Sequence, residues 1–270
     1  MTEARPRRGM FGDLGLRVVS GLLLAALALL LVWLGGAWLA AGAAIATALM
    51  LWELRRIVTG EGDFAEPRML LLGGGGALAV LAAWGFNAAA GFALVYAAAA
   101  AVFLVEAPAG RALLAAGLAY LASAMAFLLA MRAGGDGFAL VVWLVLVVIA
   151  ADVCAYFTGR AVGGRKLWSA VSPGKTWSGA VGGLVGAVVV AVAFAATQGW
   201  SLPRAGLLGA GIAVASQAGD LLESAVKRRY GVKDASGLIP GHGGLMDRLD
   251  GVMGGLWFFA LWGLAGGDAP

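Results

Sequence analysis

Hydrophobic residues in this chain form long continuous runs instead of alternating with polar residues. One run, VVSGLLLAALALLLVWLGG, is long enough as a helix to cross a hydrocarbon core about 30 Å thick. Continuous runs favour helices over a closed barrel, whose strands alternate. The pattern predicts an all-α, polytopic integral membrane protein with about nine transmembrane helices, at roughly 17–35, 37–54, 69–85, 88–105, 112–131, 138–157, 179–197, 205–222 and 251–266.

The composition agrees with a membrane protein, because 61% of the residues are hydrophobic and only 13% are charged. The first run follows the basic residues Arg5, Arg7 and Arg8, as in a signal peptide. Further apolar runs continue to the C-terminus, so an uncleaved first membrane helix is expected. The single cysteine, Cys154, lies in an apolar run, and we expect it to be a buried, unreactive thiol.

Two connections between the predicted spans are long and polar, 158–178 and 223–250. If the N-terminus lies in the cytoplasm, every Lys and Arg except Arg132 and Arg204 falls on the cytoplasmic side. Positive residues favour that side of a membrane. Both polar loops are therefore expected to face the cytoplasm, where nucleotides are found.

The end of the eighth predicted span carries a polar ridge. Gln217, Asp220, Ser224 and Lys227 recur at helical spacing and share one face, with Glu223 beside them. Such a ridge leads from the membrane to water and forms one side of a candidate site.

The start of the ninth span supplies the other side, because Asp247 and Asp250 are three residues apart and would share a helix face. Carboxylates, one histidine (His242) and no nearby thiol suit Mg²⁺ rather than zinc, and Mg²⁺ is commonly held by one or two carboxylates plus substrate phosphates. The glycines around His242 would let backbone N–H groups approach an anion. The basic residues expected to neutralise phosphate are Lys227, Arg228, Lys233 and Arg248.

Simpler interpretations exist for each of these residues. Basic residues after a membrane helix are often topology signals or head-group contacts. Asp247 and Asp250 would also suit the solvated start of a helix, and His242 would suit a turn. These interpretations leave unexplained why acids, a histidine and a glycine-rich turn gather between two spans.

The first polar loop contains WSAVSPGKTWSG, residues 168–179. Its GKT resembles the end of a P-loop, but Ser169 occupies the first glycine position and no strand of a soluble domain is expected before it, so a P-loop is rejected. Ser172, Lys175 and Thr176 remain candidate phosphate contacts.

Asp152 is an ionisable residue inside the sixth predicted span, near its loop end. Such residues are costly in a membrane and are usually functional. Tyr156 follows four residues later on the same helix face. A role for Asp152 in the site is favoured over a structural hydrogen bond or ion pair.

The stretch from Ser224 to Asp250 fits, at each specified position, the signature S-x-[apolar]-K-R-x4-K-D-x-[small]-x2-[apolar]-[PG]-x-H-G-G-[apolar]-x-D-R-[apolar]-D, and so resembles the phosphatidate cytidylyltransferase (CDP-diglyceride synthase) family. DVCAYFTGR is similar to the family's Asp-x-x-Ala-Tyr segment. SPGKTWSG is similar to its S-P-x-K-T-x-E-G segment, with Ser178 where the family usually has glutamate. The resemblance is concentrated in the last 120 residues, so we divide the chain into N-terminal membrane helices, 1–140, and a C-terminal catalytic membrane region, 141–270.

The resemblance implies that CTP and phosphatidic acid react to give CDP-diacylglycerol and pyrophosphate at the cytoplasmic face of a bacterial inner membrane. It also implies a homodimer, no nucleic-acid partner, and one or two Mg²⁺ ions on acids that correspond to Asp220 and Asp247. The predicted catalytic residues are Lys227, Arg228, Asp234, His242, Arg248 and Asp250. The predicted substrate-binding residues are Asp152, Tyr156, Ser172, Lys175, Thr176, Ser224, Lys233, Gly243 and Gly244.

Two other classes of protein are alternatives. The pattern of the CDP-alcohol phosphotransferases is absent, since DRLDG at 247–251 is only a fragment of it. A transporter or channel with a cytoplasmic phosphate-binding site would place ionisable residues near mid-span and break helices in matching halves. Here the charges gather near one membrane face, and the transporter remains the alternative.

Overall fold

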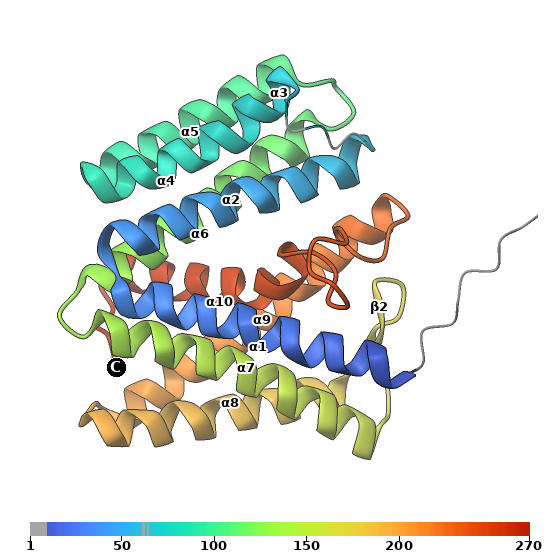
Figure 1. Cartoon of the computed structure of the whole chain (residues 1–270). Coiled ribbons are helices and arrows are strands. Elements are labelled where there is room, and N and C mark those ends of the chain that lie inside the picture. Colours follow the sequence, from blue (N-terminus) through green and yellow to red (C-terminus); the bar gives the residue numbers. More distant parts are fainter. Residues whose placement is uncertain (1–9, 61–62, 64) are drawn as a thin grey trace, which may run out of the picture.

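The structure, a computed structural model, describes residues 10–60, 63 and 65–270 and is a bundle of long helices packed side by side (Figure 1). Arg5, Arg7 and Arg8 lie outside the described residues. The first half contains α1 (Met10–Leu34), α2 (Gly36–Thr59), α3 (Pro67–Met69), the π-helix η1 (Leu70–Gly74), α4 (Gly75–Gly85), α5 (Ala88–Val105) and α6 (Arg111–Ala133). The second half contains α7 (Gly137–Val162), β1 (Lys166–Trp168), β2 (Ser172–Thr176), α8 (Trp177–Gln198), α9 (Leu202–Arg229) and α10 (Met246–Leu264).

The prediction of an all-α polytopic membrane protein is confirmed. Within the described residues, six helical stretches are long and apolar enough to cross a membrane, at Gly36–Thr59, Pro67–Gly85, Arg111–Ala133, Gly137–Val162, Trp177–Gln198 and Leu202–Arg229. Val18–Leu34 and Ala89–Val105 are shorter apolar helical stretches. The number of nine spans stays a prediction.

Small side chains hold α8 against its neighbours. The buried residues of α8 recur at every fourth position, and they are Gly179, Gly183, Ala187, Ala191 and Ala195. A Cβ on Gly183 would lie 2.6 Å from the carbonyl oxygen of Ala151 on α7, so glycine permits backbone contact there. Close backbone packing is a main source of helix association in a lipid solvent. This packing brings Asp152 on α7 next to the segment that precedes α8.

The first polar loop is more ordered than predicted. Helix α7 continues to Val162, and β1 and β2 then form an antiparallel hairpin with Lys166 opposite Thr176 and Trp168 opposite Ser172. A strand of three residues, β1, thus precedes GKT, but it belongs to a two-stranded hairpin and not to the sheet of a soluble domain. A P-loop is still excluded, because GKT lies within strand β2 instead of in a loop between a strand and a helix.

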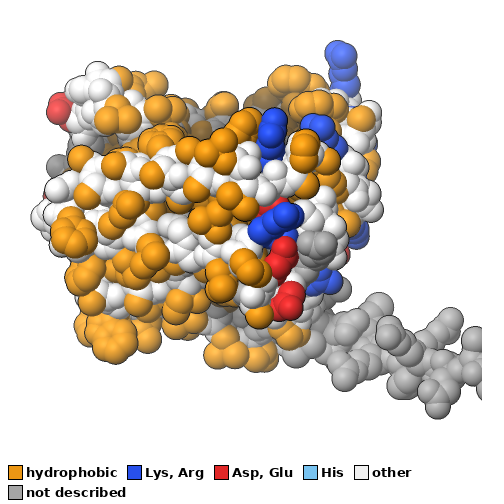
Figure 2. All heavy atoms as spheres, turned by 90° about the horizontal axis from the view of Figure 1, so that it is seen from above, with side chains coloured by type: hydrophobic (Ala, Val, Ile, Leu, Met, Phe, Trp, Pro, Cys, Tyr) orange, Lys and Arg blue, Asp and Glu red, His pale blue; other side chains and the backbone are white. Residues whose placement is uncertain are grey.

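The second polar loop is shorter than predicted, because α9 continues to Arg229 and α10 begins at Met246. The hairpin, residues 230–245 and the start of α1 all lie at one end of the bundle, and the C-terminus lies at the other (Figure 1). Hydrophobic side chains are spread over the whole face in Figure 2, and most of its charged side chains gather toward one end. The two polar loops thus lie on the same side, as the charge distribution predicts.

Candidate active site

A charged cavity of about 540 Å³ lies between α7, the hairpin, α8 and α9. Five predicted site residues line it: Asp152, Tyr156, Lys175, Thr176 and Asp220. Arg160, Lys166 and Gln217 also contribute to its wall. The structure therefore joins the first polar loop to the ridge on α9, although more than 40 residues separate them in the sequence.

An ion pair closes this junction. Lys175 Nζ on β2 lies 2.6 Å from Asp220 Oδ2 on α9, and each side chain is about one-third exposed or less. Ser224 Oγ donates to the other oxygen of Asp220, at 3.3 Å. The predicted polar face of α9 is thus present, with Asp220 at its centre.

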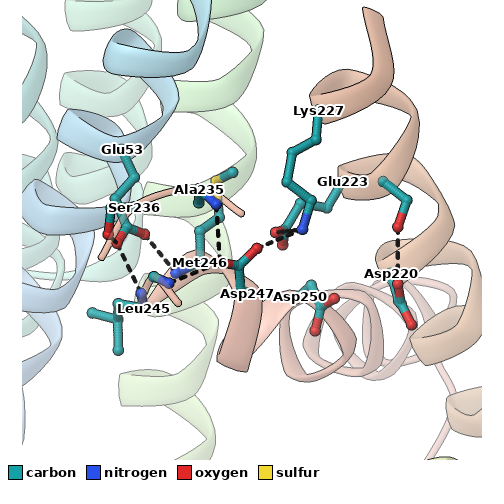
Figure 3. A network of polar contacts seen from close by, with 12 residues as sticks. Glu53, Asp220, Glu223, Lys227, Ala235, Ser236, Leu245, Met246, Asp247 and Asp250 are labelled. Atoms are coloured by element: carbon teal, nitrogen blue, oxygen red, sulfur yellow. Dashed lines mark hydrogen bonds and ion pairs between the residues drawn. The ribbon is translucent and has the colours of Figure 1, made fainter. Parts of the chain in front are cut away.

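A second ion cluster joins α9 to α10 (Figure 3). Lys227 Nζ donates to Glu223 Oε1 at 2.9 Å and to Asp247 Oδ1 at 2.5 Å. The three side chains are only 12%, 7% and 6% exposed, respectively. Glu223 Oε2 is also buried and has no hydrogen-bond partner among the described residues. We call these three residues the buried ion cluster.

Asp247 also ties the loop before α10 together. Its Oδ2 accepts hydrogen bonds from the backbone N–H groups of Ala235, at 2.9 Å, and Gly244, at 2.7 Å. Burial opposes ionisation, but the hydrogen bonds from Lys227 and these two N–H groups outweigh it and hold the pKa of the Asp247 carboxyl below its ordinary value. Gly243, with φ of +87°, leaves room for this carboxylate, because a Cβ there would lie 2.7 Å from Asp247 Oδ2.

A residue that the sequence analysis missed supports the same loop. Glu53, on α2, is fully buried and accepts hydrogen bonds from Ser236, Leu245 and Met246 (Figure 3). The available signal was an acidic residue inside the apolar stretch 37–54, which usually indicates function. The N-terminal helices thus contact the loop that carries two of the predicted catalytic residues, Asp234 and His242.

The remaining predicted residues lie around this centre. Arg228 Nε donates to the carbonyl oxygen of Val171 in the hairpin, at 3.4 Å, and Ser172 lies on β2. His242 Nδ1 lies 2.9 Å from Ser20 Oγ of α1. Lys233, Asp234 and Arg248 are exposed.

Ser178, which stands at the family's usual glutamate position, hydrogen-bonds within the junction between α7 and α8. Its Oγ donates to the carbonyl oxygen of Gly163, at the end of α7, and lies 3.0 Å from Thr176 Oγ1. Thr176 caps α8 by accepting a hydrogen bond from the Gly179 N–H, at 3.1 Å. Serine at this position therefore joins the end of α7 to the start of α8.

Carboxylates are the potential metal ligands of this site. No group of three or more His, Cys, Asp or Glu side chains with the geometry of a metal site occurs in the part of the chain that the structure describes. Asp152, Asp220 and Asp250 nevertheless lie close enough for their charges to act on one another. Their oxygen donors have the chemistry of Mg²⁺ ligands, and Mg²⁺ takes further ligands from phosphates and water.

An apolar cavity of about 310 Å³ lies behind the acids, between α2, α6, α9 and α10. Its apolar wall includes Met50, Leu54, Leu113, Ala116, Leu121, Leu222, Val226 and Met253. Glu223 and Asp250 also line it. Helix α9 therefore presents Asp220 to the charged cavity and Glu223, less than one turn later, to the apolar cavity.

Known proteins resemble this chain over about half of its length. The phosphatidate cytidylyltransferase of Brucella suis biovar 1 (strain 1330) is 47% identical over 131 residues, which are 47% of this chain and 47% of the relative. That of Haemophilus influenzae is 44% identical over 130 residues, 46% and 45% of the two chains, and that of Bacillus subtilis is 41% identical over 119 residues, 43% and 44%. The chain thus matches about half the length of these curated relatives. A family model described as "Cytidylyltransferase family" covers far more, residues 15–264, and on this match the chain belongs to the cytidylyltransferase family.

Proposed function

We propose that this protein is a phosphatidate cytidylyltransferase, which transfers the cytidylyl group of CTP to phosphatidic acid and releases pyrophosphate. The observation that carries the proposal is the pair of cavities on α9. The charged cavity suits a nucleoside triphosphate, and the apolar cavity suits an acyl chain. The names of the matched relatives support the same reaction.

In this reaction a phosphate oxygen of the lipid forms a bond to the α-phosphorus of CTP. The bond from that phosphorus to the β-phosphate oxygen breaks, and pyrophosphate leaves with the electron pair. The attacking oxygen is already anionic at neutral pH, so the main difficulty is to bring two anions together. A site for this step needs positive charge and alignment rather than a strong base.

The basic side chains of the site are placed to supply that charge. Lys175, Arg160 and Lys166 line the charged cavity, where they would contact the phosphates of CTP. Lys227 directs two of its N–H groups to Glu223 and Asp247, and an ammonium group has three, so one is left for a phosphate oxygen. Arg228 and Arg248 would draw in the lipid phosphate or the pyrophosphate.

The acyl chains remain in a hydrocarbon environment throughout. The apolar cavity opens toward α6 and α9, where Ala116 and Leu222 are exposed. An acyl chain in this cavity would place the lipid phosphate near Glu223 and Asp250, beside the basic end of α9. The cavity therefore gives a physical reason for a site at the boundary between lipid and water.

We further propose Mg²⁺ as the cofactor, one or two ions, with Asp220 and Asp247 as ligands. Asp152 and Asp250 would orient these acids or add ligands, because their charges already act together with that of Asp220. A bound cation would relieve this repulsion and offset the charge of the phosphates. Asp234, His242, Gly243 and Gly244 would shape the turn against the nucleotide.

The membrane assignment follows from the same reasoning. We propose a homodimer in the bacterial inner membrane, with the N-terminus and the polar loops in the cytoplasm. The side that carries nearly all Lys and Arg residues is the side favoured for the cytoplasm, and CTP is available there.

A pyrophosphate-release assay tests the function. The purified protein, in lipid nanodiscs with Mg²⁺, should release pyrophosphate only when CTP and phosphatidic acid are both present. Asp220→Asn should reduce the rate about 100-fold or more if the carboxylate organises the phosphates, whereas Arg229→Met, at an exposed position of the same helix, should not. Release that does not depend on phosphatidic acid would refute the proposed reaction, and full activity in Asp220→Asn would refute the role of Asp220.

A further inference from the structure

We infer that Glu53 is a positioning residue, which holds the start of α10 and thereby fixes Asp247 at the site. The inference rests on the proposed function for its consequence in catalysis, but its structural part can be tested alone. Glu53 lies on α2, far in the sequence from the stretch between Asp152 and Asp250 that carries the family's motifs. It is fully buried, so its carboxylate is held in one place by its neighbours.

Among the described residues, three groups donate hydrogen bonds to Glu53, and they belong to the loop before α10 or to the first residue of α10. Oε1 accepts from Ser236 Oγ at 2.6 Å and from Leu245 N at 2.8 Å, and Oε2 accepts from Met246 N at 2.7 Å. These partners are more than 180 residues away in the sequence. The carboxylate therefore joins the middle and the end of the loop to a helix of the other half of the chain (Figure 3).

Helix α10 needs such a partner because its own N-cap residue, Leu245, makes no side-chain capping hydrogen bond. The first N–H groups of a helix have no partner within the helix, and leaving them buried and unpaired is costly. An acidic group at this end also interacts favourably with the helix dipole. Glu53 thus performs from α2 the role that Ser, Thr, Asp or Asn usually performs from the N-cap position.

Gly244 makes the contact possible. A Cβ on Gly244 would lie 2.5 Å from Glu53 Oε1 and 2.8 Å from its Cδ. The second glycine of the His-Gly-Gly turn therefore leaves space for the carboxylate. On the other side of the turn, Ser20 Oγ of α1 donates to the carbonyl oxygen of Pro240, at 3.0 Å. Two N-terminal helices thus contact the turn.

The consequence for the site passes through Asp247, one residue after Met246. Asp247 accepts from Ala235 N and Gly244 N, next to the Glu53 partners Ser236 and Leu245. The two carboxylates thus bind neighbouring residues of the same loop, Asp247 at positions 235 and 244 and Glu53 at positions 236 and 245. If Glu53 no longer holds it, the loop can move and carry Asp247 away from Lys227, although Glu53 itself touches no reacting group.

The first test is hydrogen–deuterium exchange of the full-length protein in nanodiscs, without substrates. Glu53→Gln replaces one acceptor oxygen by an NH₂ group, which faces the loop donors with another donor. Exchange in the peptide covering 235–247 should become about tenfold faster or more, while peptides from α8 stay unchanged. Unchanged exchange in 235–247 would overturn the inference, whether or not the protein turns over CTP.

The second test separates positioning from general stability. Glu106→Gln is the matched control, because Glu106 is also a buried acid of the N-terminal helices, but it pairs with Arg55 instead of the loop. Glu53→Gln should lower kcat about tenfold or more even if both variants lose similar thermal stability. Ser236→Ala should lower kcat when it is made in the wild-type protein, and it should lower kcat little further when it is added to Glu53→Gln. Equal loss of kcat in Glu53→Gln and Glu106→Gln would show that Glu53 acts only through stability.

Discussion

Replacing Lys227 by methionine tests the buried ion cluster of Lys227, Glu223 and Asp247. Methionine keeps an unbranched apolar stem in the space of the lysine but leaves two carboxylates, 7% and 6% exposed, without their cation. Removing one partner of a buried ion pair commonly costs about 3–5 kcal/mol. Asp247 retains its hydrogen bonds from Ala235 and Gly244, so we expect a loss near the lower end of that range.

Thermal unfolding in detergent measures this loss. A free-energy change of about 3 kcal/mol corresponds to a drop in Tm on the order of 10 °C for a chain of this size. Arg229→Met is the matched control, because Arg229 lies in the same last turn of α9 but is exposed, and its Tm should change little. Lys227→Arg keeps the charge and should fall between the wild type and Lys227→Met.

A double variant identifies the cause of the loss. In Lys227→Met, Glu223 would be an unpaired buried acid, so adding Glu223→Gln should recover part of the lost stability. If Lys227→Met has the same Tm as Arg229→Met, the cluster does not act as a buried ion pair. The same conclusion follows if Glu223→Gln lowers Tm as much in Lys227→Met as it does in the wild type.

Three further predictions address the cavities and the loop. Ala116→Trp fills the apolar cavity and should raise the KM for phosphatidic acid on the order of tenfold, which corresponds to about two methylene groups of the lipid no longer being buried, while the KM for CTP stays unchanged. Ala130→Trp, at an exposed position of the same helix, is the control. Equal effects of Ala116→Trp on both KM values would contradict the assignment of this cavity to the lipid. Gly244→Ala should lower Tm more than Gly237→Ala, whose Cβ meets nothing within 4 Å, and equal Tm values would refute the close contact with Glu53. Folding lowers the pKa of Asp247, so its contribution to stability is present above the ordinary pKa of about 3.9 and is lost as pH falls through the lower pKa of the folded state. The Tm difference between wild type and Asp247→Asn should therefore be constant from pH 6 to 8 and shrink below about pH 4. A Tm difference that grows with acidification would contradict this prediction.

The sequence was sufficient for the helices and for much of the charged site. Apolar runs identify spans because hydrocarbon excludes unpaired backbone groups, and helical spacing placed Asp220 and Ser224 on one face before their hydrogen bond was seen. The predicted span ends at residue 222, although the helical spacing from Gln217 to Lys227 already indicates that the helix continues beyond it. The pairing of Lys227 with Glu223, four residues earlier, stabilises this continuation of the helix.

Contacts between distant segments were beyond the sequence. The strand Ser172–Thr176 contains proline and glycine, which argue against a strand, and only its pairing with β1 reveals it. Glu53 has an unusual position in an apolar stretch, but its partners lie on a loop nearly 200 residues away. Its role depends on the packing of α2 near α10, which periodicity does not determine.

Transfer of labelled CTP phosphate into lipid tests the central claim most directly. The wild-type protein in nanodiscs containing phosphatidic acid and Mg²⁺ would be given CTP labelled at either the α- or the γ-phosphate. We predict that the α-label enters the lipid fraction as CDP-diacylglycerol and that the γ-label stays in water as pyrophosphate. If the folded protein leaves the α-label in water, the protein is not a phosphatidate cytidylyltransferase.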